Sequence, residues 1–241
     1  MKPLLIAIST LTAFPVPTGK WSRADLKKSV IFYPLAGALI GGFLALTSKI
    51  PLPIGLQTLL ALLLWVILTM AFHLDGLGDC LDGWLGGHTP KERRRIMKDA
   101  AMGVYGTTGI VLDLLAKYVL LNHLLAKPDA LEWLIGVPVA ARWAVVLSCH
   151  TASAPSGDKG LGSQVLGLPF PAFLISTCLT LPLFFLLNWE WLFALLLSAL
   201  VSFALSAWSK NRIGGLTGDG LGATIEVSEV CLLFLACFRF A

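Results

Sequence analysis

The chain has 241 residues, of which 56% are hydrophobic and only 13% charged, and its net charge is +4. An average soluble domain has about 25% charged residues, so the composition excludes a soluble globular protein, and the high hydrophobicity excludes a disordered chain. The basic residues gather in a few connecting segments, which favours membrane topology over nucleic-acid binding. We therefore expect an all-α, polytopic bundle of transmembrane helices, with the lipid bilayer as a partner and one domain over residues 1–241.

Apolar stretches follow one another along most of the chain. A transmembrane helix needs about 20 mostly apolar residues. The stretches that approach this length are residues 30–47, 51–72, 103–125, 132–149, 165–187 and 190–208, and a shorter seventh covers 228–241. Residues 3–17 are apolar but hold three prolines, which predicts an interfacial or re-entrant lead-in. The sequence thus predicts about six or seven spans.

Lysine and arginine orient these spans. If the first span leaves the cytoplasm, most of the basic residues outside the spans fall on one side, whereas Lys49 and Lys127 fall on the other. The positive-inside rule makes the first side cytoplasmic. The long polar connections, residues 73–102, 150–164 and 209–227, share that side. We expect a multi-pass protein of the cell inner membrane with a cytoplasmic active face.

The segment FHLDGLGDCLDG contains an acidic stripe. Asp75, Asp79 and Asp82 have spacings of four and three residues, so a helix would carry all three carboxylates on one face. Three carboxylates at the mouth of a span need a compensating cation. Oxygen ligands without histidine or cysteine partners suit Mg²⁺, which usually completes its shell with water and substrate phosphates. The stripe predicts a magnesium site, the alternative being a solvated acidic loop.

A second acidic segment, GLTGDGLGATIEVSE, precedes the last apolar stretch. Its D-G-L-G-x-x-x-E pattern matches the first segment, with Asp219 and Glu226 in the places of Asp75 and Asp82. The match leaves open an internal duplication or convergence on one type of helix entry. We expect Asp219 and Glu229 to hold a second ion and Glu226 to orient or deprotonate a nucleophile, unless the segment is only a polar cap.

The residues between the two acidic segments add cations. Lys98 and Asp99 end a predicted basic helix at the membrane edge, where Lys98 would contact a phosphate and Asp99 a metal or hydroxyl, or the two would form a plain ion pair. His73 would contact phosphate or share a proton, or simply pack. The run Arg93, Arg94 and Arg95 is typical of a lipid-headgroup patch. The loop APSGDKGLGSQ has the backbone freedom of a lid or a phosphate-binding nest.

Two charged features lie inside predicted spans. Arg142 must pair with a carboxylate or a substrate anion, because an unpaired cation is costly in the bilayer. Asp113 and Lys117 are four residues apart, so we expect them to satisfy each other.

Together these motifs resemble the cobalamin synthase family. The resemblance rests on LTAFPVP, YPLAGALIGG, HLDGLGDCLDG, IMKDAAMGVYG and TGDGLGATIEVSE, which extend over most of the chain. It implies an integral membrane enzyme that needs Mg²⁺ and joins adenosylcobinamide-GDP to α-ribazole or its 5′-phosphate, with release of GMP. It leaves open a homo-oligomer.

The resemblance and the residue chemistry give one set of site residues. The expected catalytic residues are His73, Lys98, Asp99 and Glu226. The expected substrate-binding residues are Tyr105, Arg142, Thr217 and Gly218. The expected metal ligands are Asp75, Asp79, Asp82, Asp219 and Glu229.

Three other classes are weighed against this interpretation. A CDP-alcohol phosphotransferase would share Asp79, Asp82 and Gly83, but the rest of that motif is missing. A prenyltransferase would need a second aspartate-rich motif, where this chain has glutamates. A transporter would place its charges near the middle of the bilayer, whereas these gather at one face.

Overall fold

The computed structural model describes residues 1–187 and 190–238, and in this part of the chain all regular structure is helical. The helices are, in chain order, α1 (Lys2–Leu11), α2 (Arg23–Ser29), the 3₁₀ turn η1 (Val30–Phe32), α3 (Tyr33–Thr47), α4 (Ile54–Leu68), α5 (Phe72–Gly86), α6 (Pro90–Ile96), α7 (Val104–Leu125), α8 (Ala130–Thr151), α9 (Leu161–Val165), α10 (Phe170–Leu187), α11 (Trp191–Ile213) and α12 (Gly218–Phe238).

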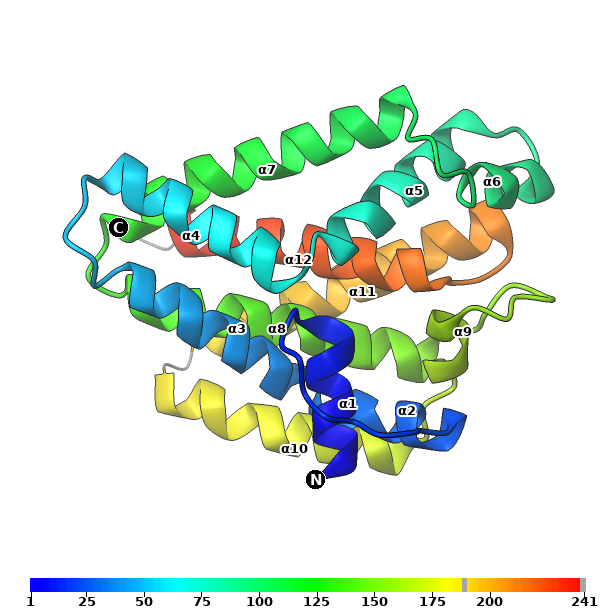
Figure 1. Cartoon of the computed structure of the whole chain (residues 1–241), viewed down its shortest axis with the longest axis horizontal. Coiled ribbons are helices and arrows are strands. Elements are labelled where there is room, and N and C mark those ends of the chain that lie inside the picture. The colour runs from blue at the N-terminus through cyan, green and yellow to red at the C-terminus, as the bar shows by residue number, and fades with distance from the viewer. Residues whose placement is uncertain (188–189, 239–241) are drawn as a thin grey trace.

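The long helices run lengthwise between two ends of the molecule (Figure 1). In the described part of the chain, five segments are long and apolar enough to cross a membrane: Arg23–Thr47, α7, α8, α11 and α12. The bent pair α4–α5 gives a sixth if it counts as one span, and Phe170–Pro182 of α10 is a shorter apolar segment. This confirms the predicted polytopic bundle.

Large apolar side chains face outward from these helices. On α7 the exposed residues Val111, Leu115 and Val119 recur at every turn, and Leu192, Leu196 and Leu200 do the same on α11. A stripe of this kind on a water-soluble protein would be an association surface, whereas in a bilayer it contacts lipid. The outward-facing stripes therefore agree with a bundle embedded in lipid.

Helix α8 forms the centre of the bundle, with most of its length buried. Helix α3 packs against it very closely, because Gly37 and Gly41 present no side chains there. A Cβ at Gly41 would lie only 2.6 Å from the Cα of Ile135. On another side of α8, the ring of Trp191 covers Gly136. These contacts fix α8 as the frame on which the other helices pack.

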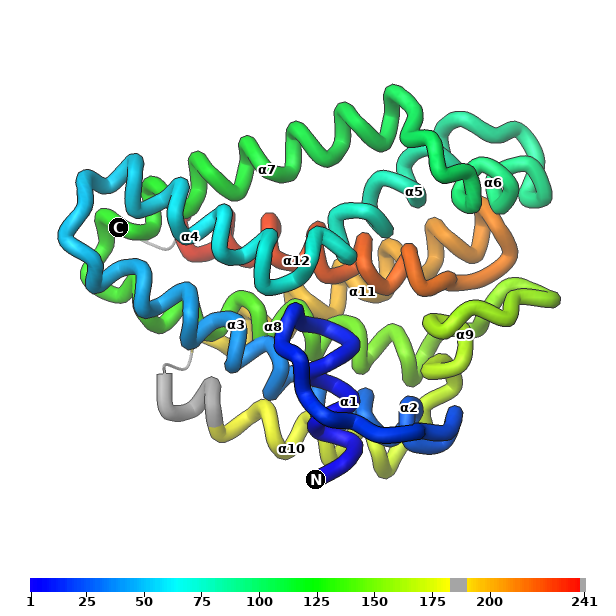
Figure 2. The backbone as a smooth tube through the Cα atoms, in the orientation of Figure 1, coloured from blue at the N-terminus to red at the C-terminus, as the bar shows by residue number. Residues whose placement is uncertain are grey.

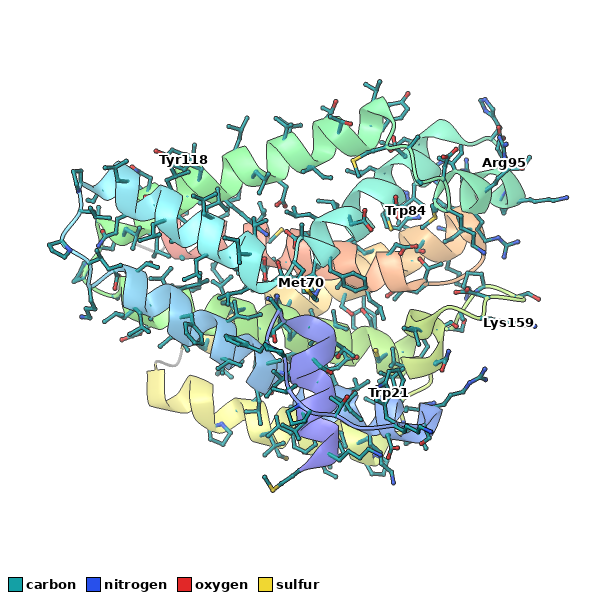
Figure 3. All side chains as sticks on the ribbon, in the orientation of Figure 1. Trp21, Met70, Trp84, Arg95, Tyr118 and Lys159 are labelled. Carbon is teal, nitrogen blue, oxygen red and sulfur yellow. The ribbon has the colours of Figure 1, made fainter. Side chains whose placement is uncertain are left out.

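The break between α4 and α5 positions the acidic stripe. The two helices meet at 82°, and the residues between them, Met70 and Ala71, have left-handed backbone angles of φ 52° and 54°. Two consecutive left-handed residues other than glycine are costly, so the surrounding packing must hold them. Met70 lies at this corner in Figure 3. The predicted span 51–72 therefore ends early, and a separate helix carries the aspartates.

The acidic segments and polar connections share one end of the bundle. Helix α6, the loop before α9 and the start of α12 lie together there, as the colour gradient of the chain trace shows (Figure 2). Arg95 on α6 and Lys159 in the loop mark this end in Figure 3. Helix α12 begins at Gly218, whereas the sequence predicts a short span from residue 228, so the second acidic segment lies within a long helix.

Candidate active site

An open cavity of about 510 Å³ lies where α12 begins, and we call it the outer cavity. The predicted site residues in its wall are Lys98, Thr217, Gly218 and Asp219. The other lining residues are Phe72, Arg94, Met97, Ser156, Gly157, Asp158, Gly160, Leu161 and Gly162. The outer cavity thus collects residues from four separate parts of the chain.

Two cations reach the outer cavity from α6 and the turn that follows it. The Nη1 of Arg94 donates a hydrogen bond to the backbone oxygen of Ser156 at 3.2 Å, which ties α6 to the loop before α9. Lys98 is exposed and lies within electrostatic range of the Asp219 carboxylate. Cations of this kind bind phosphate oxygens, Lys as a point charge and Arg through a planar fork of donors. The outer cavity suits an anionic ligand.

Three aspartates surround the point where α5 crosses α12. Asp75 and Asp79 lie one turn apart on α5, and Asp219 lies in the first turn of α12. Gly76 allows the crossing, since a Cβ there would lie 2.9 Å from the backbone oxygen of Asp219. Asp79 consequently feels the charges of both Asp75 and Asp219. The two acidic segments do meet, and their carboxylates repel one another in the absence of a cation.

The donor set fits Mg²⁺ only if a ligand completes it. Among the described residues, no three aspartate, glutamate, histidine or cysteine side chains are grouped so as to hold a metal ion. Proteins commonly bind Mg²⁺ through one or two carboxylates, with water and substrate phosphates supplying the remaining oxygens. One or two of the carboxylates of Asp75, Asp79 and Asp219, beside the outer cavity, would serve that mode of binding.

Asp82 has a different environment from the other two members of the stripe. It is buried, its Oδ2 accepts the backbone N–H of Gly103 at 2.6 Å, and its Oδ1 accepts that of Gly106 at 2.9 Å. These amides belong to the start of α7, where a negative charge is favourable. In the structure Asp82 holds the start of α7 in place, and the role of metal ligand that the sequence predicts for it stays a prediction.

Glu226 and Glu229 lie in the interior, not in the outer cavity. The Nζ of Lys117 on α7 forms ion pairs with both glutamates, at 2.7 Å to Glu229, and with Asp113 at 3.4 Å. All four side chains are buried. The predicted Asp113–Lys117 pair is present, and it is part of a larger network that joins α7 to α12.

Arg142 extends the same network to α8. Its guanidinium is fully buried and forms an ion pair with Glu229, as the sequence requires of a cation inside a span. Its Nη2 lies 3.5 Å from the Nδ1 of His73 on α5. We call His73, Asp113, Lys117, Arg142, Glu226 and Glu229 the interior charge network. The structure thus places Arg142, Glu226 and Glu229 in this network, and none of them lines the outer cavity.

The remaining predicted residues have simpler positions. Asp99 accepts the backbone N–H of Ala101 at 3.1 Å, and Tyr105 is exposed at the start of α7, so neither lines the outer cavity. Thr217 accepts the backbone N–H of Gly220 at 3.3 Å and so caps α12. The first turn of α12 faces the outer cavity. The backbone N–H groups of a first turn have no hydrogen-bond partner within the helix.

Comparison with known proteins now identifies the family. The profile of the cobalamin-5-phosphate synthase family matches residues 3–237. The chain belongs to this family. No solved structure is significantly similar to the chain.

Curated relatives are similar to this member of the cobalamin-5-phosphate synthase family over nearly their whole length. The chain is 38% identical to the adenosylcobinamide-GDP ribazoletransferase of Acinetobacter baumannii (strain ACICU), over 97% of this chain and 96% of the relative. It is 36% identical to the protein of the same name from Pseudomonas syringae pv. syringae (strain B728a), over 97% and 98%. The corresponding protein of Chlorobaculum tepidum is 34% identical, over 97% and 94%.

The structure of this family member adds residues that the sequence did not assign to the site. Arg94 belongs to a predicted lipid-headgroup patch, yet it lines the outer cavity. Asp158 and the glycines of the following loop also contribute to the wall. The glycine-rich sequence predicts a phosphate-binding nest, and its segment packs closely on the start of α12, since a Cβ at Gly162 would lie 2.2 Å from the Cα of Gly218.

Proposed function

We propose that this chain transfers the cobinamide phosphate of adenosylcobinamide-GDP to α-ribazole or its 5′-phosphate, with release of GMP. The names and nearly full-length similarity of the relatives support the reaction. The observation that carries the proposal is the outer cavity, in which Arg94, Lys98 and the start of α12 face one space beside three aspartates.

The reaction needs a diphosphate site and a nucleophile site in contact. A ribose hydroxyl of the ribazole attacks the phosphorus on the cobinamide side, so a new P–O bond forms. The bond from that phosphorus to the bridging oxygen breaks, and the electron pair leaves with GMP. The hydroxyl proton must pass to a base. The outer cavity offers cations for the diphosphate and a carboxylate for the proton.

The residues of the outer cavity divide these tasks. Lys98 and Arg94 neutralise the charge that develops on the leaving phosphate. The amides at the start of α12 orient the phosphate oxygens, since the N-terminus of a helix attracts anions. Asp219 lies in the same turn and accepts the hydroxyl proton. Holding both reactants in one cavity accounts for much of the rate increase expected of such an enzyme.

We also propose that the reaction depends on Mg²⁺ held by Asp75 and Asp79, with water and substrate phosphate oxygens completing its shell. Bound there, the ion would offset the charge of the diphosphate. The crowding of three carboxylates at the crossing of α5 and α12 supports this assignment. A titration of turnover against Mg²⁺ tests it: Asp75→Asn and Asp79→Asn should each raise the Mg²⁺ concentration needed for half-maximal rate, whereas Asp99→Asn should not.

The proposed location is the cell inner membrane, with the outer cavity at the cytoplasmic face. Phosphorylated nucleotides occur in the cytoplasm, and Arg93, Arg94, Arg95, Lys98 and Lys159 lie at that end of the bundle, as the positive-inside rule requires. A substrate as large and charged as adenosylcobinamide-GDP would reach an open cavity there without entering the lipid.

The decisive experiment measures GMP. The purified protein in lipid nanodiscs receives adenosylcobinamide-GDP, Mg²⁺ and α-ribazole, and GMP is quantified by chromatography. We expect GMP and the corrinoid product in equal amounts, and neither when α-ribazole is omitted. Absence of GMP with all three components present would refute the proposed function, as would release of GMP without formation of the corrinoid product.

A further inference from the structure

A second space lies behind the outer cavity, and we call it the inner chamber. It measures about 230 Å³ and is lined by α1, α2, α3, α5, α8, α9 and α12. Four residues line both spaces: Phe72, Leu161, Gly162 and Gly218. A ligand that occupies both spaces would therefore pass between α5, α9 and the start of α12.

The wall of the inner chamber is almost entirely apolar. Among its lining residues only Thr10, Tyr33 and His73 carry polar side-chain atoms. The hydroxyl of Thr10 already donates to the backbone oxygen of Ile6 at 2.8 Å. A space of this composition favours a flat apolar group with very few hydrogen-bonding atoms.

His73 lines this wall and carries an unsatisfied hydrogen-bonding atom. Its side chain is only 2% exposed, and its Nε2 has no hydrogen-bond partner in the described part of the chain. Buried polar atoms are nearly always paired in native proteins, so an exception of this kind calls for an explanation. A ligand atom in the inner chamber would supply the missing partner.

The other ring nitrogen of His73 indicates which kind of atom is missing. The guanidinium of Arg142 lies 3.5 Å from Nδ1, and a guanidinium can only donate hydrogen bonds. Glu226 is 4.0 Å from Nδ1, beyond hydrogen-bond distance. Nδ1 therefore acts as the acceptor, and the proton of the neutral ring lies on Nε2. The Nε2–H of His73 is thus a buried donor without an acceptor among the described residues.

We propose that the inner chamber binds the aromatic base of the ribazole substrate, and that the Nε2–H of His73 donates to the free ring nitrogen of that base. The inference rests on the proposed function and extends it to the acceptor substrate. Dimethylbenzimidazole has one free acceptor nitrogen on an otherwise apolar bicyclic ring, which matches the wall. Guanine has several donors and acceptors on one edge, and most of them would stay unpaired there. With the base inside, the ribose lies at the shared rim, beside Asp219.

Two probe molecules isolate the hydrogen bond without any need for turnover. 5,6-Dimethylbenzimidazole and 5,6-dimethylindole have nearly the same shape, but the second has C–H where the first has the acceptor nitrogen. Equilibrium dialysis against the full-length protein in nanodiscs measures the binding of each. We expect the wild-type protein to bind dimethylbenzimidazole about tenfold more tightly, which corresponds to about 1.4 kcal/mol. Equal binding of the two probes would overturn the proposal.

Variants of His73 provide the second part of the test. His73→Asn keeps a polar atom near Arg142 but removes the donor at the Nε2 position, so the preference for dimethylbenzimidazole should disappear. His73→Gln restores a donor at that position and should recover part of the preference. His123→Asn, on the exposed side of α7, is the matched control and should behave as wild type. If the His73→Asn protein still binds dimethylbenzimidazole more tightly than dimethylindole, then the base binds elsewhere and the proposal is wrong.

Steady-state kinetics then connect the inner chamber to the reaction. His73→Asn, and Val165→Phe, which fills the inner chamber from α9, should raise the KM for α-ribazole about tenfold and leave the KM for adenosylcobinamide-GDP unchanged. The opposite pattern would place the corrinoid nucleotide in the inner chamber and overturn the proposal. If the protein binds the base with the expected dependence on His73 but releases no GMP, then the proposed function is wrong. The proposal that the inner chamber binds the base is supported in that case.

Discussion

Asp82 on α5 and Gly106 on α7 are joined directly, the backbone N–H of Gly106 donating to the Oδ1 of Asp82 at 2.9 Å. Gly106 has to be glycine, because a Cβ there would approach the other carboxylate oxygen of Asp82 to 2.4 Å. The same carboxylate accepts the backbone N–H of Gly103. Asp82 thus forms one structural joint with Gly103 and Gly106, which lie more than twenty residues later in the sequence.

This joint predicts that Asp82→Ala destabilises the protein. Removing a buried carboxylate leaves two backbone amides without acceptors, and bonds to a charged group contribute about 1.5–3 kcal/mol each. We expect the free energy of unfolding to fall by about 3–6 kcal/mol for the two bonds together, measured by SDS titration of the protein in mixed micelles. Asp79→Ala, which removes a partly exposed carboxylate of the same helix, should change stability far less. An Asp82→Ala protein of normal stability that requires more Mg²⁺ would show that Asp82 is a metal ligand.

The interior charge network predicts that the stability of the protein depends strongly on Glu229. Glu229→Gln would leave Arg142 buried beside a neutral amide, and breaking one side of a buried pair commonly costs about 3–5 kcal/mol. The double variant Glu229→Gln, Arg142→Met removes the stranded charge and should recover part of that loss. Unfolding of the single and double variants in the same micelles measures the coupling. Additive effects would mean that the two side chains do not support each other.

The start of α12 shows why the sequence predicts some elements and not others. The spacing of the acidic stripe 75–82 puts its carboxylates on one face if the segment is helical, and α5 shows that it is. The last span was predicted from residue 228, after Asp219 and Glu226 of the second acidic segment, but α12 begins at Gly218. Lys117 and Arg142 neutralise these glutamates inside the bundle. A partner so distant in the sequence is invisible to a local hydropathy count.

The position of Glu226 follows from the same cause. Its place in the D-G-L-G repeat correctly associates its segment with Asp75, but it lies deeper along α12 than Asp219. At 1.5 Å per residue, the two α12 carboxylates are about 10 Å apart along the helix axis. Only Asp219 lines the outer cavity. The sequence therefore predicts that the two acidic segments meet. It does not show that Asp219 lines the outer cavity and Glu226 lies in the interior, because that difference depends on how far each residue lies along α12.

Lys98 is expected to bind the corrinoid substrate through its diphosphate. Lys98→Ala should raise the KM for adenosylcobinamide-GDP about tenfold, with little change in the KM for α-ribazole, because the lost charge faces the outer cavity. Lys91→Ala is the matched control, since Lys91 is exposed on α6 and does not line the outer cavity. Equal effects of the two substitutions would indicate a general influence of positive charge on binding.

The topology predicts which residues a membrane-impermeant thiol reagent reaches from each side. In a background without the five native cysteines, single cysteines at Arg95 and Lys159 should react from the cytoplasmic side. Cysteines at Lys49 and Pro128, at the other end of the bundle, should react only from outside. Labelling of inverted and right-side-out vesicles makes the comparison. Opposite sides for positions 95 and 159 would contradict the single outer cavity.

The last prediction separates Asp219 from Glu226 in catalysis. Asp219 lines the outer cavity, so Asp219→Asn should lower the rate of GMP release in a single turnover by at least about a hundredfold, as expected for a general base or metal ligand. Stability and binding of adenosylcobinamide-GDP should stay close to wild type, because Asp219 is only partly buried. Glu226→Gln should do the reverse, lowering stability through the loss of the ion pair with Lys117 while the remaining folded protein keeps most of its chemical rate. A stable Glu226→Gln protein with a slow chemical step would instead bring Glu226 into the active site and would require α12 to shift along its axis during the reaction.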